Sequence, residues 1–130
     1  GFCMLIADID HFKRINDEYG HLIGDEVLCA AAGRLLSQLR TDVDWVVRFG
    51  GEEFVIVLPD IGPPDAQLVA ERLREAIATS LPLQDGRLLQ ITASLGVAVW
   101  QPGEGMEPWL KRADALLYRA KLAGRNRVEA

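Results

Sequence analysis

The sequence predicts an α/β sandwich in which helices cover a mixed β-sheet. Apolar runs typical of strands alternate along the chain with segments of helical periodicity, an arrangement that favours helices packed on a sheet. Near the middle of the chain, Gly50 and Gly51 separate two strand-like runs, which is typical of an antiparallel hairpin. Because that central hairpin is antiparallel, a doubly wound parallel sheet is the less favoured architecture.

The first half of the chain contains the opening strand, two helices and the hairpin. The first apolar run ends in acidic residues, as expected for a buried strand, and the mixed segment after it ends at Gly20. A longer segment repeats apolar residues at the spacing of one helix face, with Gly24 and Asp25 at its start. We therefore expect strands over residues 2–9, 45–49 and 52–58, and helices over residues 11–19 and 25–39.

The second half continues the alternation of helix and strand. Residues 65–80 and 107–123 show helical periodicity, and Gly124 is expected to stop the second of these helices. Residues 88–100 alternate between apolar and polar positions, which predicts a half-buried strand or a hairpin. A last strand is expected to begin at Val128.

The composition limits the possible partners. A chain of 130 residues fits one compact domain. Its net charge is −5 and it has no block of lysines or arginines, which argues against nucleic acid or an anionic membrane as a main partner. No apolar run approaches the roughly 18 residues that span a bilayer. Without a signal peptide or a Cys-x-x-Cys pair, the sequence favours a cytoplasmic location.

The chain enters a strand pattern at its second residue, without a start methionine. We therefore expect a domain over residues 1–130 that was cut from a longer protein. That longer protein is expected to have an upstream sensory or anchoring domain. Such a domain can attach the protein to a membrane.

Acidic residues close the first predicted strand. Asp8 and Asp10 are two positions apart and therefore point to the same side of the strand. Carboxylates at the end of an apolar strand are costly to bury unless they are solvated or paired with cations. Two of them can hold Mg²⁺, which takes oxygen ligands. The alternative is a polar strand end in which Asp10 caps the next helix.

The Gly50-Gly51 turn leads directly into two glutamates. Glycines let a backbone approach a ligand closely and adopt positive φ. Glu52 and Glu53 are adjacent, so in a strand they face opposite sides. One of them can join Asp8 on a metal ion while the other faces a substrate. The alternative is a tight hairpin with solvated acids.

Two further groups of polar residues can contact a nucleotide. Asn16, His21 and Asp25 offer the donors and acceptors needed to read a guanine edge, or they serve as helix caps. Lys121 and Arg125 lie four residues apart on one helix face and can meet phosphate oxygens, or they are solvated cations near a helix end. The chain has neither a P-loop nor a dinucleotide-binding glycine motif.

Taken together, these motifs resemble the GGDEF family of diguanylate cyclases. The resemblance covers almost the whole chain and centres on the turn Arg48-Phe49-Gly50-Gly51-Glu52-Glu53-Phe54. The family condenses two GTP into cyclic di-GMP and releases pyrophosphate, on a fold like the palm of nucleotide cyclases and polymerases. The resemblance therefore implies a five-stranded central sheet and a nucleotidyltransferase activity. The other matching segments are residues 8–17, 20–28, 92–98 and 113–126.

The resemblance also implies a metal site and a catalytic residue. By this match, Asp8 and Glu53 hold Mg²⁺ or Mn²⁺, helped by the main-chain carbonyl of Ile9. Glu52 lies beside the attacking 3′-hydroxyl and acts either as a base or as a second metal ligand. Two metal ions can stabilise the attacking and the leaving oxygens of such a transfer.

The substrate-binding residues follow from the same match. Asn16 and Asp25 correspond to positions that read guanine, with His21 nearby. Each domain holds one GTP, so the resemblance implies a homodimer for turnover. The positions that meet the triphosphate or the turn are Lys13, Lys121, Arg125, Gly50 and Gly51.

The sequence departs from the family pattern in three places. The third motif residue is Glu52, where the family name has Asp, although both residues occur in active members. The family's inhibitory Arg-x-x-Asp keeps Asp44 but has Thr41 at the arginine position, and Arg40 is one residue out of register. Product inhibition through this site is therefore not expected. The helix and loop that usually precede the first strand are also missing.

Three functions fit these observations to different degrees. An active cyclase is the leading hypothesis, because Asp8, Asn16, Asp25, Glu52 and Glu53 are all present. A catalytically inactive domain that binds GTP and regulates an attached domain is the alternative. A structural dimerisation module would leave so many polar residues at strand ends without a role.

Overall fold

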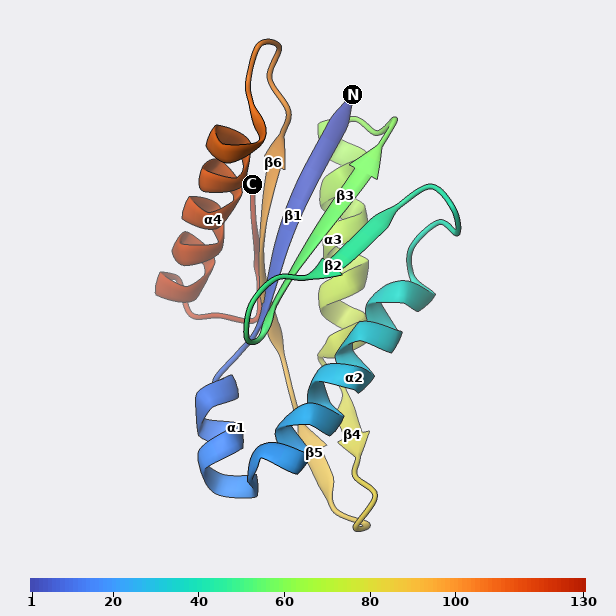
Figure 1. Ribbon diagram of the computed structural model, residues 1–130, viewed down its shortest axis with the longest axis vertical. Helices are drawn as coiled ribbons and strands as arrows, with labels where there is room; N and C mark the ends of the chain where they lie inside the picture. Colours follow the sequence, from blue (N-terminus) through green and yellow to red (C-terminus); the bar gives the residue numbers. More distant parts are fainter.

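In the computed structural model, which describes residues 1–130, five strands form one mixed sheet (Figure 1). Neighbouring strands are antiparallel, except that the last pair is parallel. The predicted mixed five-stranded sheet with flanking helices is therefore confirmed. In sheet order the strands are β2 (Trp45–Arg48), β3 (Glu53–Pro59), β1 (Phe2–Ile9), β6 (Ala93–Val99) and β7 (Val128–Glu129).

Helices cover the two faces of the sheet unequally. In Figure 1, α2 (His21–Ser37) and α3 (Pro63–Ile77) lie on one side, and α4 (Met106–Leu122) lies on the other. The larger core, with 24 buried residues, fills the α2/α3 side, whereas 6 buried residues form the core under α4. The short helix α1 (Phe12–Tyr19) lies beyond the end of β1 and packs on α2.

The alternation of side chains along β1 determines which face receives its acidic end. Leu5 and Ile9 enter the α2/α3 core, whereas Met4 and Ile6 enter the core under α4. Two residues after Ile6, Asp8 therefore points to the α4 side, where the C-terminal end of that helix supplies cations.

The second helix begins earlier than its apolar pattern predicts. The sequence suggested a start at Asp25, but α2 begins at His21, directly after Gly20 with φ 88°. Gly24 is therefore inside the helix, and its N–H donates to the Gly20 carbonyl over 3.0 Å. The first turn contains His21 and Gly24, so the apolar repeat of the helix becomes visible only after Asp25, which explains the difference.

The segment 88–100, predicted as a half-buried strand or a hairpin, contains two strands, and the preceding helix ends earlier than predicted. α3 stops at Ile77, and β4 (Ser80–Pro82) pairs with β5 (Leu88–Gln90) in a separate hairpin. The chain then enters the central sheet, where the Asp10 N–H donates to the Thr92 carbonyl over 2.9 Å. β6 is buried on both faces rather than on one, because α4 covers its second face.

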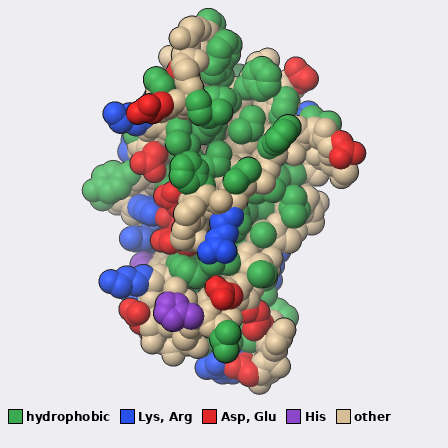
Figure 2. Space-filling view, viewed as in Figure 1, with side chains coloured by type: hydrophobic (Ala, Val, Ile, Leu, Met, Phe, Trp, Pro, Cys, Tyr) green, Lys and Arg blue, Asp and Glu red, His purple; other side chains and the backbone are tan.

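The surface beside α4 is apolar in one half of the molecule. Trp45, Val47, Phe49 and Met106 are exposed and line a shallow apolar cavity. Figure 2 shows apolar side chains gathered over the upper half of the view, while most charged groups lie in the middle and below. No helix is both long enough and apolar enough to cross a bilayer.

Candidate active site

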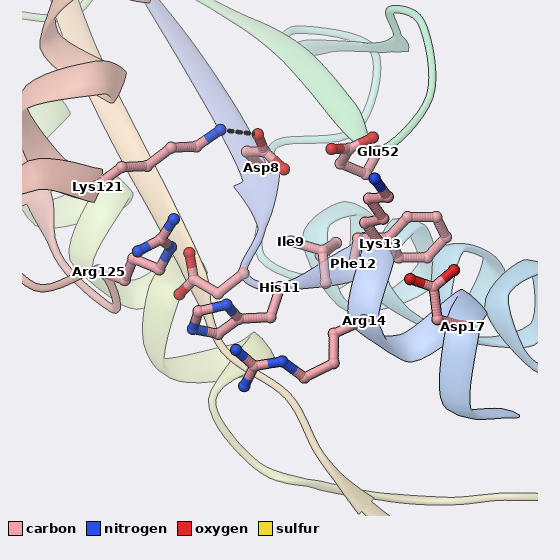
Figure 3. A pocket seen from close by; sticks show the side chains of 11 residues that line it. Asp8, Ile9, His11, Phe12, Lys13, Arg14, Asp17, Glu52, Lys121 and Arg125 are labelled. Atoms are coloured by element: carbon pink, nitrogen blue, oxygen red, sulfur yellow. Dashed lines mark hydrogen bonds and ion pairs between the residues drawn. The ribbon is translucent and has the colours of Figure 1, made fainter.

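A polar cavity of about 520 Å³ opens where β1 ends and α1 begins. Figure 3 shows that four segments form its wall: the end of β1, α1, the turn before β3 and the end of α4. Acidic and basic side chains both line it, so the cavity can meet metal ions and phosphates. The lining residues are 8–14, Asp17, Glu52, Lys121 and Arg125.

Asp8 is the more buried of the two buried aspartates that line this cavity, with only 2 % of its surface exposed. Burial is the main cause that raises the pKa of its carboxyl to about 6, and the charges of Glu52 and Glu53 contribute in the same direction. Lys121 Nζ donates to Asp8 Oδ2 and opposes this shift (Figure 3). Three carboxylates thus lie close together, and the one that is most buried requires a cation beside it.

The strand register places Glu53 directly opposite Asp8. The two residues are paired across β1 and β3, so both side chains leave the sheet on the α4 side. Burial raises the pKa of the half-buried Glu53 carboxyl, and the charge of Asp114 raises it further. The adjacent Glu52 lines the main cavity, whereas Glu53 and Asp114 line a neighbouring pocket.

These residues fit a hard divalent cation. Asp8 and Glu53 face each other across the strands and offer carboxylate oxygens, and Ile9 lines the cavity beside Asp8. No three His, Cys, Asp or Glu side chains converge into a complete cage. A Mg²⁺ ion typically binds through one or two carboxylates and takes its other ligands from water and substrate phosphates. The donor set is therefore suited to a metal that shares its coordination with a nucleotide.

The glycine turn connects β2 and β3 and reaches toward the end of β1. Gly50 has φ 68°, in the region that favours glycine, and its carbonyl accepts from the Glu53 N–H over 3.3 Å. The Glu52 carbonyl accepts from the Ile9 N–H over 3.5 Å. Gly50 and Gly51 are exposed and do not line the cavity, although they hold Glu52 at its edge.

The residues expected to read guanine meet at the junction of α1 and α2, outside the lining of the cavity. Asn16 Oδ1 is buried without a hydrogen-bond partner. A Cβ at Gly24 would lie 1.9 Å from that oxygen, so the glycine makes room for the Asn16 side chain. His21 and Asp25 are exposed on the first turns of α2. This acceptor has no partner within the protein, and an unsatisfied buried group of this kind needs an explanation.

The three cations expected to meet phosphates line the cavity together. Lys13 comes from α1, and Lys121 and Arg125 come from the C-terminal end of α4 (Figure 3). Arg14 and Asp17 also line the cavity, although sequence reasoning did not select them. Asp17 lies four residues after Lys13 and three after Arg14 on α1, a spacing that places the three on one helix face and could have identified them.

Asp10 does not cap α1, which was one of the two roles considered from the sequence. The N-terminal cap of α1 is His11, with φ 56°, and no side-chain hydrogen bond caps that helix. Both carboxylate oxygens of Asp10 instead accept protein hydrogen bonds, from Thr92, Ser94 and the main chain of Asn126. It is therefore not a free partner of Asp8 for a metal ion.

The expected inhibitory position has a different arrangement from the family pattern. Arg40 Nη2 donates to Asp44 Oδ1 over 2.7 Å, and the Arg40 N–H donates to Asp44 Oδ2 over the same distance. The Asp44 side chain is only 3 % exposed as a result. Thr41 is exposed in the turn between them. Arg40, which is one residue out of register, is thus the ion-pair partner of Asp44.

Comparisons with known proteins agree on one family. The family model of the diguanylate cyclase GGDEF domain matches residues 1–127. The chain is 48 % identical over 126 residues to the diguanylate cyclase DgcP of Pseudomonas aeruginosa, covering 97 % of this chain and 19 % of that protein. It spans 38 % of the diguanylate cyclase VdcA of Vibrio cholerae, at 45 % identity over 96 % of this chain.

Solved structures show the same fold. The GGDEF domain of DgcB from Caulobacter crescentus, in complex with cyclic di-GMP, aligns with a TM-score of 0.93 and 35 % identity, over 99 % of this chain and 77 % of that one. The active GGEEF domain of a diguanylate cyclase from Vibrio cholerae aligns with a TM-score of 0.82 and 35 % identity, over 98 % and 81 %. The GGEEF motif of the second has Glu at the third position, as in this chain.

Proposed function

Because this chain belongs to the GGDEF family of diguanylate cyclases, we propose that it condenses two GTP molecules into cyclic di-GMP and releases two pyrophosphates. One observation carries this proposal above the others. The carboxylates of Asp8 and Glu52 and the cations Lys13, Lys121 and Arg125 line one cavity, and Glu53 faces Asp8 across the strands. This is the donor set that a metal-bound triphosphate requires.

Asp8 and Glu53, with the Ile9 carbonyl, are proposed to hold Mg²⁺ or Mn²⁺. The bound ion would draw negative charge from the α-phosphate and from the leaving pyrophosphate. Lys121 balances the buried Asp8 charge when no metal is bound. When the cation takes over that balance, the Lys121 ammonium is free to turn toward phosphate oxygens, joined by Lys13 and Arg125.

Glu52 is proposed to act on the attacking hydroxyl. Its carboxylate lines the cavity at the edge of the turn, where a 3′-hydroxyl presented by a second nucleotide can reach it. It either accepts the proton of that hydroxyl or serves as a ligand to a second metal ion. Asn16 and Asp25, with His21 nearby, are proposed to bind the guanine edge, whose N–H groups can donate to the unpaired Asn16 Oδ1.

The reaction is proposed to require two copies of the chain. One cavity offers one set of phosphate cations, so each copy presents one GTP and the two hydroxyls attack across the interface. The chain spans only 19 % to 38 % of the length of the curated relatives described above. We propose that further domains in such proteins bring the two copies together.

Pyrophosphate release from GTP and Mg²⁺ by an artificially dimerised chain tests the proposal. Release is expected, with cyclic di-GMP as the second product. Binding of GTP without release would favour an inactive regulatory domain. Absence of both binding and release would leave only a structural dimerisation module.

Gly24→Ala is expected to lower the affinity for GTP about tenfold while unfolding remains cooperative. The new Cβ would approach Asn16 Oδ1 to 1.9 Å and force that side chain to rotate away from its position. Calorimetric titration with GTP and with ATP checks this. Gly33→Ala, on the same helix with open space around it, is the matched control and should leave GTP affinity unchanged. Equal GTP affinity of the two variants would contradict the role of Asn16.

Thr41→Arg is expected to raise the affinity for cyclic di-GMP about tenfold, because it restores the arginine of the family's inhibitory pair. Since Arg40 already binds Asp44, the double variant Arg40→Ala with Thr41→Arg should gain more than the single one. Calorimetry with cyclic di-GMP measures both variants. If neither binds the product more tightly than the original chain, the proposed register of the inhibitory site is wrong.

A further inference from the structure

A buried carboxylate without a cationic partner lies next to the proposed active site. Asp10 is 5 % exposed and follows directly after β1. Ser94 Oγ donates to its Oδ1 and Thr92 Oγ1 donates to its Oδ2, each over 2.6 Å. A buried carboxylate is costly unless donors surround it, and here two hydroxyls surround it, one just before β6 and one within β6.

The third donor to Asp10 comes from the other end of the chain. The Asn126 N–H donates to Asp10 Oδ2 over 3.0 Å, across 116 residues of sequence. The side chain of Asn126 is held as well, because Arg74 Nη1 donates to its Oδ1 over 2.7 Å. Arg74 is in turn fixed by Glu71 on α3. Main chain and side chain of Asn126 are therefore both anchored to the rest of the fold.

The segment anchored in this way carries Arg125. Gly124, Arg125 and Asn126 have φ of 123°, 63° and 48°, so three consecutive residues adopt left-handed conformations after α4. Such backbone is unfavourable for residues other than glycine and persists only when its surroundings hold it. Arg125 itself has no side-chain hydrogen bond or ion pair, and it lines the cavity beside Lys121 (Figure 3).

We infer that Asp10 is a positioning residue, which holds the turn Gly124–Asn126 so that Arg125 faces the triphosphate of the bound nucleotide. The inference rests on the proposed function, because it gives Arg125 its ligand. Asp10 acts through the Asn126 N–H and needs only a hydrogen-bond acceptor there. A residue that bound a metal ion directly would instead need its negative charge.

The test compares affinities for two nucleotides by calorimetry in Mg²⁺. The probes are GTP with an α,β-methylene bridge, which cannot release pyrophosphate, and GMP, which lacks the phosphates that Arg125 would meet. Asp10→Ala is expected to weaken binding of the triphosphate about tenfold and to leave GMP binding within about twofold. Asp10→Asn keeps an oxygen toward the Asn126 N–H and can donate to Ser94, so it should restore most of the triphosphate affinity.

A double-mutant cycle identifies Arg125 as the group through which Asp10 acts. In the Arg125→Ala background, Asp10→Ala should cause no further loss of triphosphate affinity. Additive losses, equal losses for GMP, or an Asp10→Asn variant as weak as Asp10→Ala would each overturn the inference. Asp65→Asn, an exposed aspartate on α3, is the matched control.

Two further results separate the possible failures. If the original chain does not bind the triphosphate analogue, the proposed function fails, and not only the role of Asp10. If Asp10→Ala does not fold, Asp10→Ser keeps a hydroxyl at this buried position but is too short to accept from the Asn126 N–H as Asp10 Oδ2 does. It should give the same selective loss for the triphosphate, and a full retention of affinity would contradict the inference.

Discussion

Glu53→Gln is expected to lower cyclic di-GMP formation by about a hundredfold or more without lowering thermal stability. The amide has the size of the carboxylate but no charge, so the proposed metal site loses one of its two acidic ligands. Pyrophosphate release by the dimerised chain measures the activity, and thermal unfolding measures stability in the same preparations.

The direction of the stability effect follows from the pKa of Glu53. Burial raises that pKa in the folded state, so ionisation of the carboxyl is less favourable in the folded chain than in the unfolded one. The stability attached to the protonated form is present at low pH and is lost as the pH rises through the raised pKa. At neutral pH an uncharged glutamine removes this cost, so the variant should melt at the same temperature or higher.

Glu75→Gln is the matched control, because Glu75 is exposed on α3, far along the chain from the turn. It should retain full activity. A Glu53→Gln enzyme with more than about a tenth of the original rate would contradict the metal role, since the loss of a ligand of that kind costs several kcal/mol of transition-state stabilisation. A clear drop in melting temperature would instead attribute the loss to misfolding.

The sequence predicted the elements of the fold more closely than their edges. Strands such as β1 and β3 are largely buried, so they appear in the sequence as continuous apolar runs. Gly50-Gly51 locates the hairpin between β2 and β3. The three-residue strands β4 and β5 were not separated from their neighbours. Such short pairs depend on a contact between distant residues, which no local periodicity contains.

The acidic residues of the site also depend on contacts between distant residues that local sequence patterns do not contain. Asp8 and Glu53 are adjacent because β1 and β3 pair in one particular register, 45 positions apart in the chain, and residue patterns alone left several registers open. Resemblance to the family supplied that pairing. The hydrogen bonds of Asp10 could not be predicted from local patterns because its partners Thr92, Ser94 and Asn126 all come from the C-terminal third of the chain.

Gly96→Ala is expected to destabilise the domain by about 3 kcal/mol or more, the upper part of the range for overpacking. A Cβ at this position would lie 2.4 Å from the Ala113 carbonyl oxygen and 2.4 Å from the Leu117 nitrogen, both backbone atoms of α4. Backbone atoms cannot rotate away as a side chain can. The strand and the helix must therefore separate, which opens the core of 6 residues under α4.

Gly33→Ala provides the comparison of opposite sign. Gly33 lies inside α2 with no atom near its missing Cβ, so alanine should raise stability by roughly 0.5–1 kcal/mol through its better helix propensity. Urea denaturation of both variants measures the two free energies of unfolding. Similar midpoints would show that α4 does not pack on β6 as closely as described.

The consequence of Gly96→Ala for activity follows from what α4 carries. Lys121 and Arg125 reach the cavity from the end of this helix, while Asp8 and Glu52 come from β1 and the turn before β3. A displacement of α4 by even a fraction of an ångström therefore moves the phosphate cations relative to the carboxylates. The folded fraction of the variant should bind GTP more weakly than its GMP affinity predicts. The missing side chain of one glycine thus sets the distance between the two halves of the site.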